Sequence, residues 1–232
     1  MSSRANAARI RAIVFDFDGL VVDTEGPVFE GWRSLYQSLG QELSEELWAD
    51  VIGHGAGWFD PFPDLEAAVG GPLDREALHQ ARRAKELELV ASQPVLPGVL
   101  DWIARAQELG LGLGVASSSS LRWVNGHLDR LGITAFRCVR GRDSVAEGRT
   151  KPAPDLYLSA VSCLGVTPSE AVAIEDSGVG LTAAKSAGLR CVAVPGPLTL
   201  RNDFSAADLR LGSLAERTLD EVLAELQAAP AG

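Results

Sequence analysis

The most constraining feature of the sequence is a short apolar run, Ile13 to Phe15, that leads into two carboxylates one residue apart, Asp16 and Asp18. An unbroken apolar run that ends at a turn residue, here Gly19, is typical of a strand buried on both faces of a sheet. Such a strand would hold both carboxylates at its carboxyl end. Two acids placed so closely need a counter-charge, because like charges at short range are costly to ionise together. Mg²⁺ suits this position, since it binds a few carboxylates together with substrate phosphate.

The order of predicted elements indicates an α/β fold with a doubly wound, mostly parallel sheet. Apolar strands are expected at residues 111–116, 136–139, 171–174, 191–194 and 208–211, and helical patterns lie between most of them. Strands that alternate with helices form a parallel sheet with helices on both faces. Ligands bind such sheets at the carboxyl ends of the strands. We expect residues 1–22 and 94–232 to form this catalytic core.

The segment 23–93 shows helical periodicity and no strand pattern. Thr24, Ser44 and Asp74 are expected to cap the starts of three helices. A turn-rich piece, residues 53–63, separates the second helix from the third. We expect the whole segment to form an all-helical cap that closes over the sheet edge and excludes water.

Charge and composition restrict the class of partner. The chain has 232 residues, of which 46% are hydrophobic, and a formal net charge of −10. This acidity argues against binding to nucleic acid or to an anionic membrane. We expect a small phosphorylated metabolite as the partner, and a protein that is a monomer or a weak dimer. An acidic protein that handles a phosphate ester must build a local positive pocket or use a metal ion.

The three cysteines, Cys138, Cys163 and Cys191, are odd in number and widely spaced. We expect all three to be reduced residues of the core. Residues 1–11 lack the apolar segment of a secretory signal, and no run approaches membrane-spanning length. The expected location is the cytoplasm.

Three of the predicted strands end in groups suited to catalysis: Asp16, Ser117 and Asp176. Asp16 is the candidate nucleophile, because a carboxylate beside a metal can attack a phosphoryl group and carry it. Asp18 fits a general acid and base. Ser117 and Ser118 precede a predicted helix, where hydroxyl and backbone N–H groups can bind phosphate.

The remaining candidates come from two other stretches. Lys151 lies between turn-forming prolines and can stabilise a phosphorylated aspartate. Asp176 and Glu175 supply a second acidic group for the metal, which Asp16 and Asp18 would also bind. Each motif alone also has an ordinary structural interpretation, such as a turn, a surface lysine or a helix cap.

Together, the segment 16–19, Ser117, Lys151 and the pair 175–176 resemble the four motifs of the haloacid-dehalogenase-like superfamily of phosphotransferases. The resemblance covers essentially the whole chain, including a helical cap after the first motif. It implies a Rossmann-like core and a Mg²⁺-dependent phosphatase or phosphomutase that works through an aspartyl-phosphate at Asp16. The cap resembles the branch that contains beta-phosphoglucomutase and small sugar-phosphate phosphatases. In that cap, Glu25 and His54 are the candidate substrate contacts.

Further cap residues, Trp58, Arg82 and Lys85, are also candidate contacts, although surface or packing roles remain open for all five. Dehalogenases of the superfamily lack an acid at the position of Asp18, which argues against that activity. Residues that beta-phosphoglucomutase uses for its second phosphate are replaced here, for example by Val28. The comparison favours hydrolysis of a monophosphate and keeps the phosphomutase as the alternative. A phospho-acceptor signalling module and a catalytically weak binding protein are alternatives from other classes.

Overall fold

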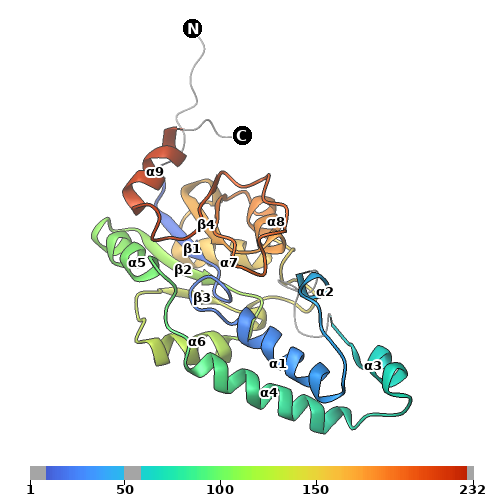
Figure 1. The fold of residues 1–232 in the computed structure, drawn as a ribbon. Coiled ribbons are helices and arrows are strands. Elements are labelled where there is room, and N and C mark those ends of the chain that lie inside the picture. Colours follow the sequence, from blue (N-terminus) through green and yellow to red (C-terminus); the bar gives the residue numbers. More distant parts are fainter. Residues whose placement is uncertain (1–8, 50–58, 229–232) are drawn as a thin grey trace.

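The computed structural model describes residues 9–49 and 59–228 and is built around a six-stranded parallel sheet (Figure 1). The strands are β1 (Ala12–Phe15), β2 (Gly112–Ala116), β3 (Cys138–Arg140), β4 (Ala171–Glu175), β5 (Arg190–Ala193) and β6 (Leu209–Arg210). Their order is β3-β2-β1-β4-β5-β6, so the direction of winding reverses between β1 and β4. The predicted doubly wound α/β sheet is confirmed.

Helices cover both faces of the sheet. On one face lie α5 (Val99–Glu108), α6 (Leu121–Leu131) and α9 (Leu219–Ala228), and on the other α7 (Asp155–Leu164) and α8 (Gly178–Ser186). Successive side chains of β1 alternate between these two cores, as the two-residue period of a strand requires: Ile13 and Phe15 face the first, Ala12 and Val14 the second. All four are buried, which confirms that the apolar run is a strand covered on both faces.

Within the described residues, four helices lie between β1 and α5: α1 (Glu25–Ser38), α2 (Glu45–Ala49), α3 (Phe62–Val69) and α4 (Arg75–Ala91). Figure 1 shows α1 and α4 side by side, away from the sheet. These helices share their own apolar cluster, which includes Phe29, Trp32, Leu35, Phe62 and Leu65. The chain enters and leaves this helical unit at one place, because Val22 bridges Val95 and the Leu96 N–H donates to the Val21 carbonyl at 2.9 Å.

The helix starts only partly follow the prediction. Ser44 and Asp74 accept hydrogen bonds from backbone N–H groups of the helices that they precede. Thr24 does not, because its hydroxyl donates instead to Asp18. Helix α3 was not predicted, since the prolines around its first turn made the stretch appear to be a turn. Among the described helices, none is long and apolar enough to cross a membrane.

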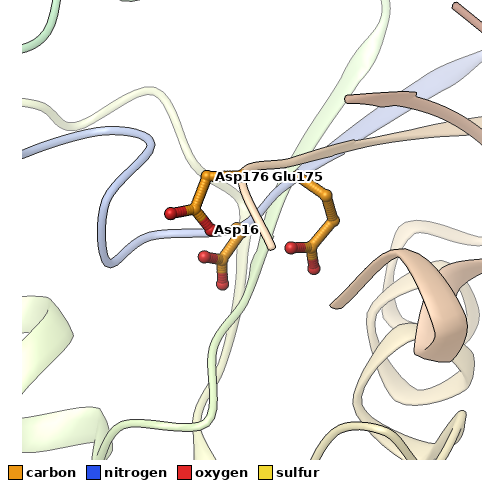
Figure 2. A group of neighbouring side chains, drawn as sticks. All are labelled: Asp16, Glu175 and Asp176. Carbon is orange, nitrogen blue, oxygen red and sulfur yellow. The ribbon is translucent and has the colours of Figure 1, made fainter. Parts of the chain in front are cut away.

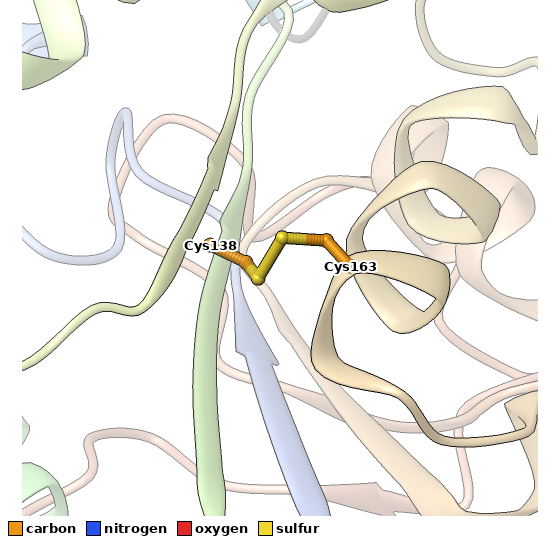
Figure 3. Close-up of a disulfide and its surroundings, with 2 residues drawn as sticks. All are labelled: Cys138 and Cys163. Atoms are coloured by element: carbon orange, nitrogen blue, oxygen red, sulfur yellow. A yellow bond between two sulfur atoms is a disulfide. The ribbon is translucent and has the colours of Figure 1, made fainter.

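The prediction that all cysteines are reduced is wrong for two of them. Cys138 on β3 and Cys163 on α7 form a disulfide with their Cα atoms 6.1 Å apart (Figure 3). Their separation of 25 positions hid this proximity in the sequence, and it arises because α7 packs against β2 and β3. Cys191 is free and buried in the core, as predicted.

Candidate active site

The carboxyl ends of the central strands bring the predicted residues together. Asp16 follows β1, Ser117 follows β2 and Asp176 follows β4, and all three are buried. The register aligns these ends, because Phe15 pairs with Val115 on one side and with Ile174 on the other. The site therefore lies where the winding of the sheet reverses, which is where open α/β sheets bind their ligands.

Three carboxylates form a compact cluster at this edge. One oxygen each from Asp16, Glu175 and Asp176 lies within 4.8 Å of the others. Figure 2 shows these three neighbouring side chains. The Lys151 ammonium donates to Asp16 at 2.5 Å and to Glu175 at 2.6 Å. The Tyr157 hydroxyl also donates to Glu175. This arrangement pairs three buried acids with a single buried lysine, so the cluster has more negative than positive charge.

The electrostatics of the cluster reflect that imbalance. Burial raises the pKa of Asp16 to about 7, against the lowering effect of Lys151. Burial, with the neighbouring carboxylates, also raises the pKa of Asp176 well above its ordinary value. Although burial alone lowers the pKa of Lys151, Asp16 and Glu175 outweigh it and raise that pKa above its usual range. The oxygen donors and the missing positive charge fit a hard divalent cation.

The Asp18 carboxylate takes no part in this cluster and is held by three donors. The Thr24 hydroxyl and the Trp123 indole N–H donate to Oδ1 at 2.9 and 2.8 Å. The Ser117 hydroxyl donates to Oδ2 at 2.9 Å. The donors come from the start of α1, from α6 and from the end of β2. Ser117, which we expected to bind phosphate, thus has its proton engaged by Asp18.

Two glycines allow the acidic residues to approach the backbone closely. Gly19 has φ +82°, and a Cβ there would lie 2.2 Å from an oxygen of Asp176. A Cβ on Gly180 would lie 1.9 Å from an oxygen of Glu175. Ser177 caps α8 by accepting from the Gly180 N–H, so the carboxylate of Asp176 is not used as the helix cap.

A cavity of about 400 Å³ opens over the cluster, and residues of the helical insert line its far side. Asp16, Asp18, Lys151, Ser118 and Asp176 line it from the sheet. The insert contributes Glu25, Arg82, Arg83 and Glu86, and the first 3₁₀ turn (Arg142–Ser144) adds Arg142.

Of the candidate substrate contacts in the insert, Glu25 lines the cavity and Lys85 does not. Glu25 lies in the cavity wall, where burial and then the charges of Asp18 and Asp16 raise its pKa to about 8. Lys85, whose side chain is 43% exposed, pairs with Glu88 and is not part of the described cavity wall. His54 and Trp58 lie outside the described residues. The Ser118 hydroxyl is buried and has no partner among the described residues, so it is available to a ligand.

Several residues of the site carry no signal in the local sequence. Trp123 sits on α6 with no motif around it, and its contact with Asp18 spans 105 residues. Tyr157 follows ordinary helical periodicity, and its link to Glu175 gave no local signal. Arg83 and the buried Glu86 were not among the candidate contacts, although both reach the cavity. Thr24 stands at the N-cap position of α1 as predicted, but the donation of its hydroxyl to Asp18, six residues away, was not predicted.

Comparison with known proteins agrees with this geometry. The haloacid dehalogenase-like hydrolase family matches residues 10–188. The chain belongs to this family. Among haloacid dehalogenase-like proteins, the putative phosphatase YhcW of Bacillus subtilis is 42% identical over 94% of this chain and 98% of its own length. Hexitol phosphatase B of Escherichia coli is 35% identical over 93% of this chain and 97% of its own.

A solved structure of a haloacid dehalogenase-like relative shares the fold. It is a mutant of CbbY from Rhodobacter sphaeroides in complex with xylulose-(1,5)bisphosphate. Its TM-score is 0.70 at 32% identity, and the match covers 89% of this chain and 96% of that one. The protein is thus an enzyme of the haloacid dehalogenase-like hydrolases, similar to members that are named as phosphatases.

Proposed function

We propose that the protein is a Mg²⁺-dependent phosphatase that hydrolyses a small phosphate monoester, such as a sugar phosphate, through an aspartyl-phosphate at Asp16. The observation that carries this proposal is the convergence of Asp16, Lys151, Glu175 and Asp176 in one cavity. The names of the relatives, a hexitol phosphatase and a sugar-bisphosphate complex, support the substrate class.

The residues of the chain suit a double displacement. A carboxylate oxygen of Asp16 attacks phosphorus, the P–O bond to the alcohol breaks, and Asp18 gives its proton to the departing oxygen. Asp18 then removes a proton from water, which attacks the phosphoaspartate. The bond to Asp16 breaks, and inorganic phosphate and the free carboxylate result. Lys151 donates to Asp16 and can offset the negative charge that develops on the phosphoryl oxygens.

Asp16 and Asp176 would hold the cation, with Glu175 as a direct ligand or as the partner that orients Lys151. When bound, Mg²⁺ supplies the positive charge that the three carboxylates and the phosphate lack. The backbone carbonyl of Asp18 would be a further ligand of the cation. The Asp18 carboxylate accepts hydrogen bonds from Thr24 and Trp123 and is not part of the cluster.

We further propose that residues 23–93 act as the cap of a core formed by 1–22 and 94–232. The adjacent entry and exit segments, joined by the bridge between Val22 and Val95, support this division, because a unit attached at one place can move as a rigid body. We expect the protein to act in the cytoplasm as a monomer or weak dimer. The disulfide weighs against that location, since reducing compartments disfavour such bonds.

The test is phosphate release with and without Mg²⁺ from a panel of sugar phosphates, phosphoglycolate, nucleotides and p-nitrophenyl phosphate. We expect Asp16→Asn to abolish turnover, while Asp101→Asn, an exposed aspartate on α5, keeps it. Turnover that survives Asp16→Asn would refute the nucleophile. Isomerisation of glucose 1-phosphate without phosphate release would establish the phosphomutase alternative. No turnover of any compound would leave the signalling or binding alternatives.

A further inference from the structure

Trp123 connects the helical insert to the proposed general acid. Its indole N–H donates to Asp18 Oδ1 at 2.8 Å, and the guanidinium of Arg83 lies over its ring at 4.7 Å. Trp123 belongs to α6 of the core, whereas Arg83 belongs to α4 of the insert. One side chain therefore contacts both the acid and the unit that covers the cavity.

The orientation of the Trp123 ring is held from several sides. His127, one turn later on α6, meets the ring edge-to-face with centroids 4.3 Å apart. His127 in turn lies 6.2 Å from the ring of Phe17 and accepts a hydrogen bond from Arg130. A tryptophan has a single donor and no acceptor, so a fixed ring fixes the direction of that hydrogen bond. The hydroxyls of Thr24 and Ser117, by contrast, can rotate.

On the side of the insert, Arg83 is held by an acidic residue of its own helix. Glu86, which is 2% exposed, accepts from both Arg82 and Arg83 on the same helix. Arg82 lies over the ring of Trp32 on α1, 4.7 Å from its centroid. The position of Arg83 over Trp123 is therefore tied to the packing of α1 against α4. A shift of α4 would remove this contact.

We propose that Trp123 is a positioning residue that orients Asp18 for proton transfer, and that Arg83 couples this orientation to the seating of α4. The inference rests on the proposed function, because it requires Asp18 to protonate the leaving oxygen. It predicts a defect confined to substrates whose leaving group needs a proton. A side chain that served only the packing of the protein would affect all substrates alike.

The deciding experiment measures kcat/KM of Trp123→Phe on an alkyl phosphate from the panel and on an activated phosphate, p-nitrophenyl or acetyl phosphate. Phenylalanine keeps an aromatic ring for Arg83 and removes the N–H donor. We expect kcat/KM to fall about tenfold on the alkyl phosphate, the effect of one hydrogen bond to a charged group. On the activated phosphate it should stay within about twofold, because that leaving group departs without a proton.

The matched control is Trp102→Phe, which removes a core indole N–H that donates to the Arg217 carbonyl instead. It should leave the ratio of the two kcat/KM values unchanged. Equal losses of kcat/KM on both substrates for Trp123→Phe, or no loss on either, would overturn the inference. In that case, turnover by the wild type would still support the proposed function. A wild type that hydrolyses neither compound would refute the proposed function itself, and the inference with it.

The role of Arg83 is tested by a double-mutant cycle. Introduced into the wild type, Arg83→Met should lower the ratio of kcat/KM on the alkyl phosphate to kcat/KM on the activated phosphate. In the Trp123→Phe background it should change this ratio little, because the two residues act through one contact. Additive effects on the ratio would show that Arg83 acts separately and would overturn the coupling.

Discussion

Replacement of Lys151 by methionine tests whether the acidic cluster depends on one buried cation. The lysine side chain is 4% exposed, and those of its partners Asp16 and Glu175 are 9% and 0% exposed. Methionine has a similar length and no charge, so it leaves two buried carboxylates without the lysine's counter-charge. Removal of one member of a buried ion pair costs about 3–5 kcal/mol. That is a large share of the roughly 5–15 kcal/mol by which domains are stable.

A second ion pair provides the control. Lys185 donates to Asp208 at 2.7 Å, but the two side chains are 35% and 27% exposed. Pairs that water can reach contribute at most about 1 kcal/mol. Lys185→Met should therefore lower the free energy of unfolding far less than Lys151→Met, although both substitutions remove one lysine charge.

The assay is urea denaturation followed by circular dichroism, with a chelator present, at pH 5 and at pH 8. Asp16 has a folded pKa of about 7, above its ordinary 3.8, so its protonation favours the folded state. That stabilisation is complete below 3.8 and is lost as the pH rises through 7. Because Lys151 lowers this pKa, its removal raises it further, and the deficit of Lys151→Met should be larger at pH 8 than at pH 5. Equal deficits for the two lysine variants, or a larger deficit at pH 5, would refute the reasoning.

Two further predictions concern the turn after β1 and the disulfide. Gly19→Ala should lower phosphatase activity at least about tenfold, because its Cβ would displace the Asp176 carboxylate. The control is Gly40→Ala, where φ is +69° and no atom lies close to the new Cβ. This variant has a similar backbone strain and should keep its activity. Equal losses of activity in the two variants would contradict the explanation. Without reductant, Cys138 and Cys163 should resist alkylation, and reduction should lower the free energy of unfolding by about 3 kcal/mol for a loop of this length. Alkylation of both without reductant would disprove the bond.

Much of the fold and of the candidate site could be predicted because the signals are local. The apolar run before Asp16 marked the central strand, and the same type of run marked β2 and β4. Parallel strands place their carboxyl ends at one edge, so Asp16, Ser117 and Asp176 could be expected to lie near one another without coordinates. The order of their motifs was enough to suggest the family.

Other features depended on how distant segments pack. The contacts of Asp18 with Trp123, of Glu175 with Tyr157, and of Cys138 with Cys163 join residues that no periodicity relates. They arise because each helix lies at a particular place and rotation on the sheet.

The sequence by itself determined which groups stand at the ends of the strands, because side-chain alternation and turn residues act over a few positions. Only the tertiary structure decided which donor each carboxylate receives, because hydrogen bonds depend on distances between elements far apart in the chain.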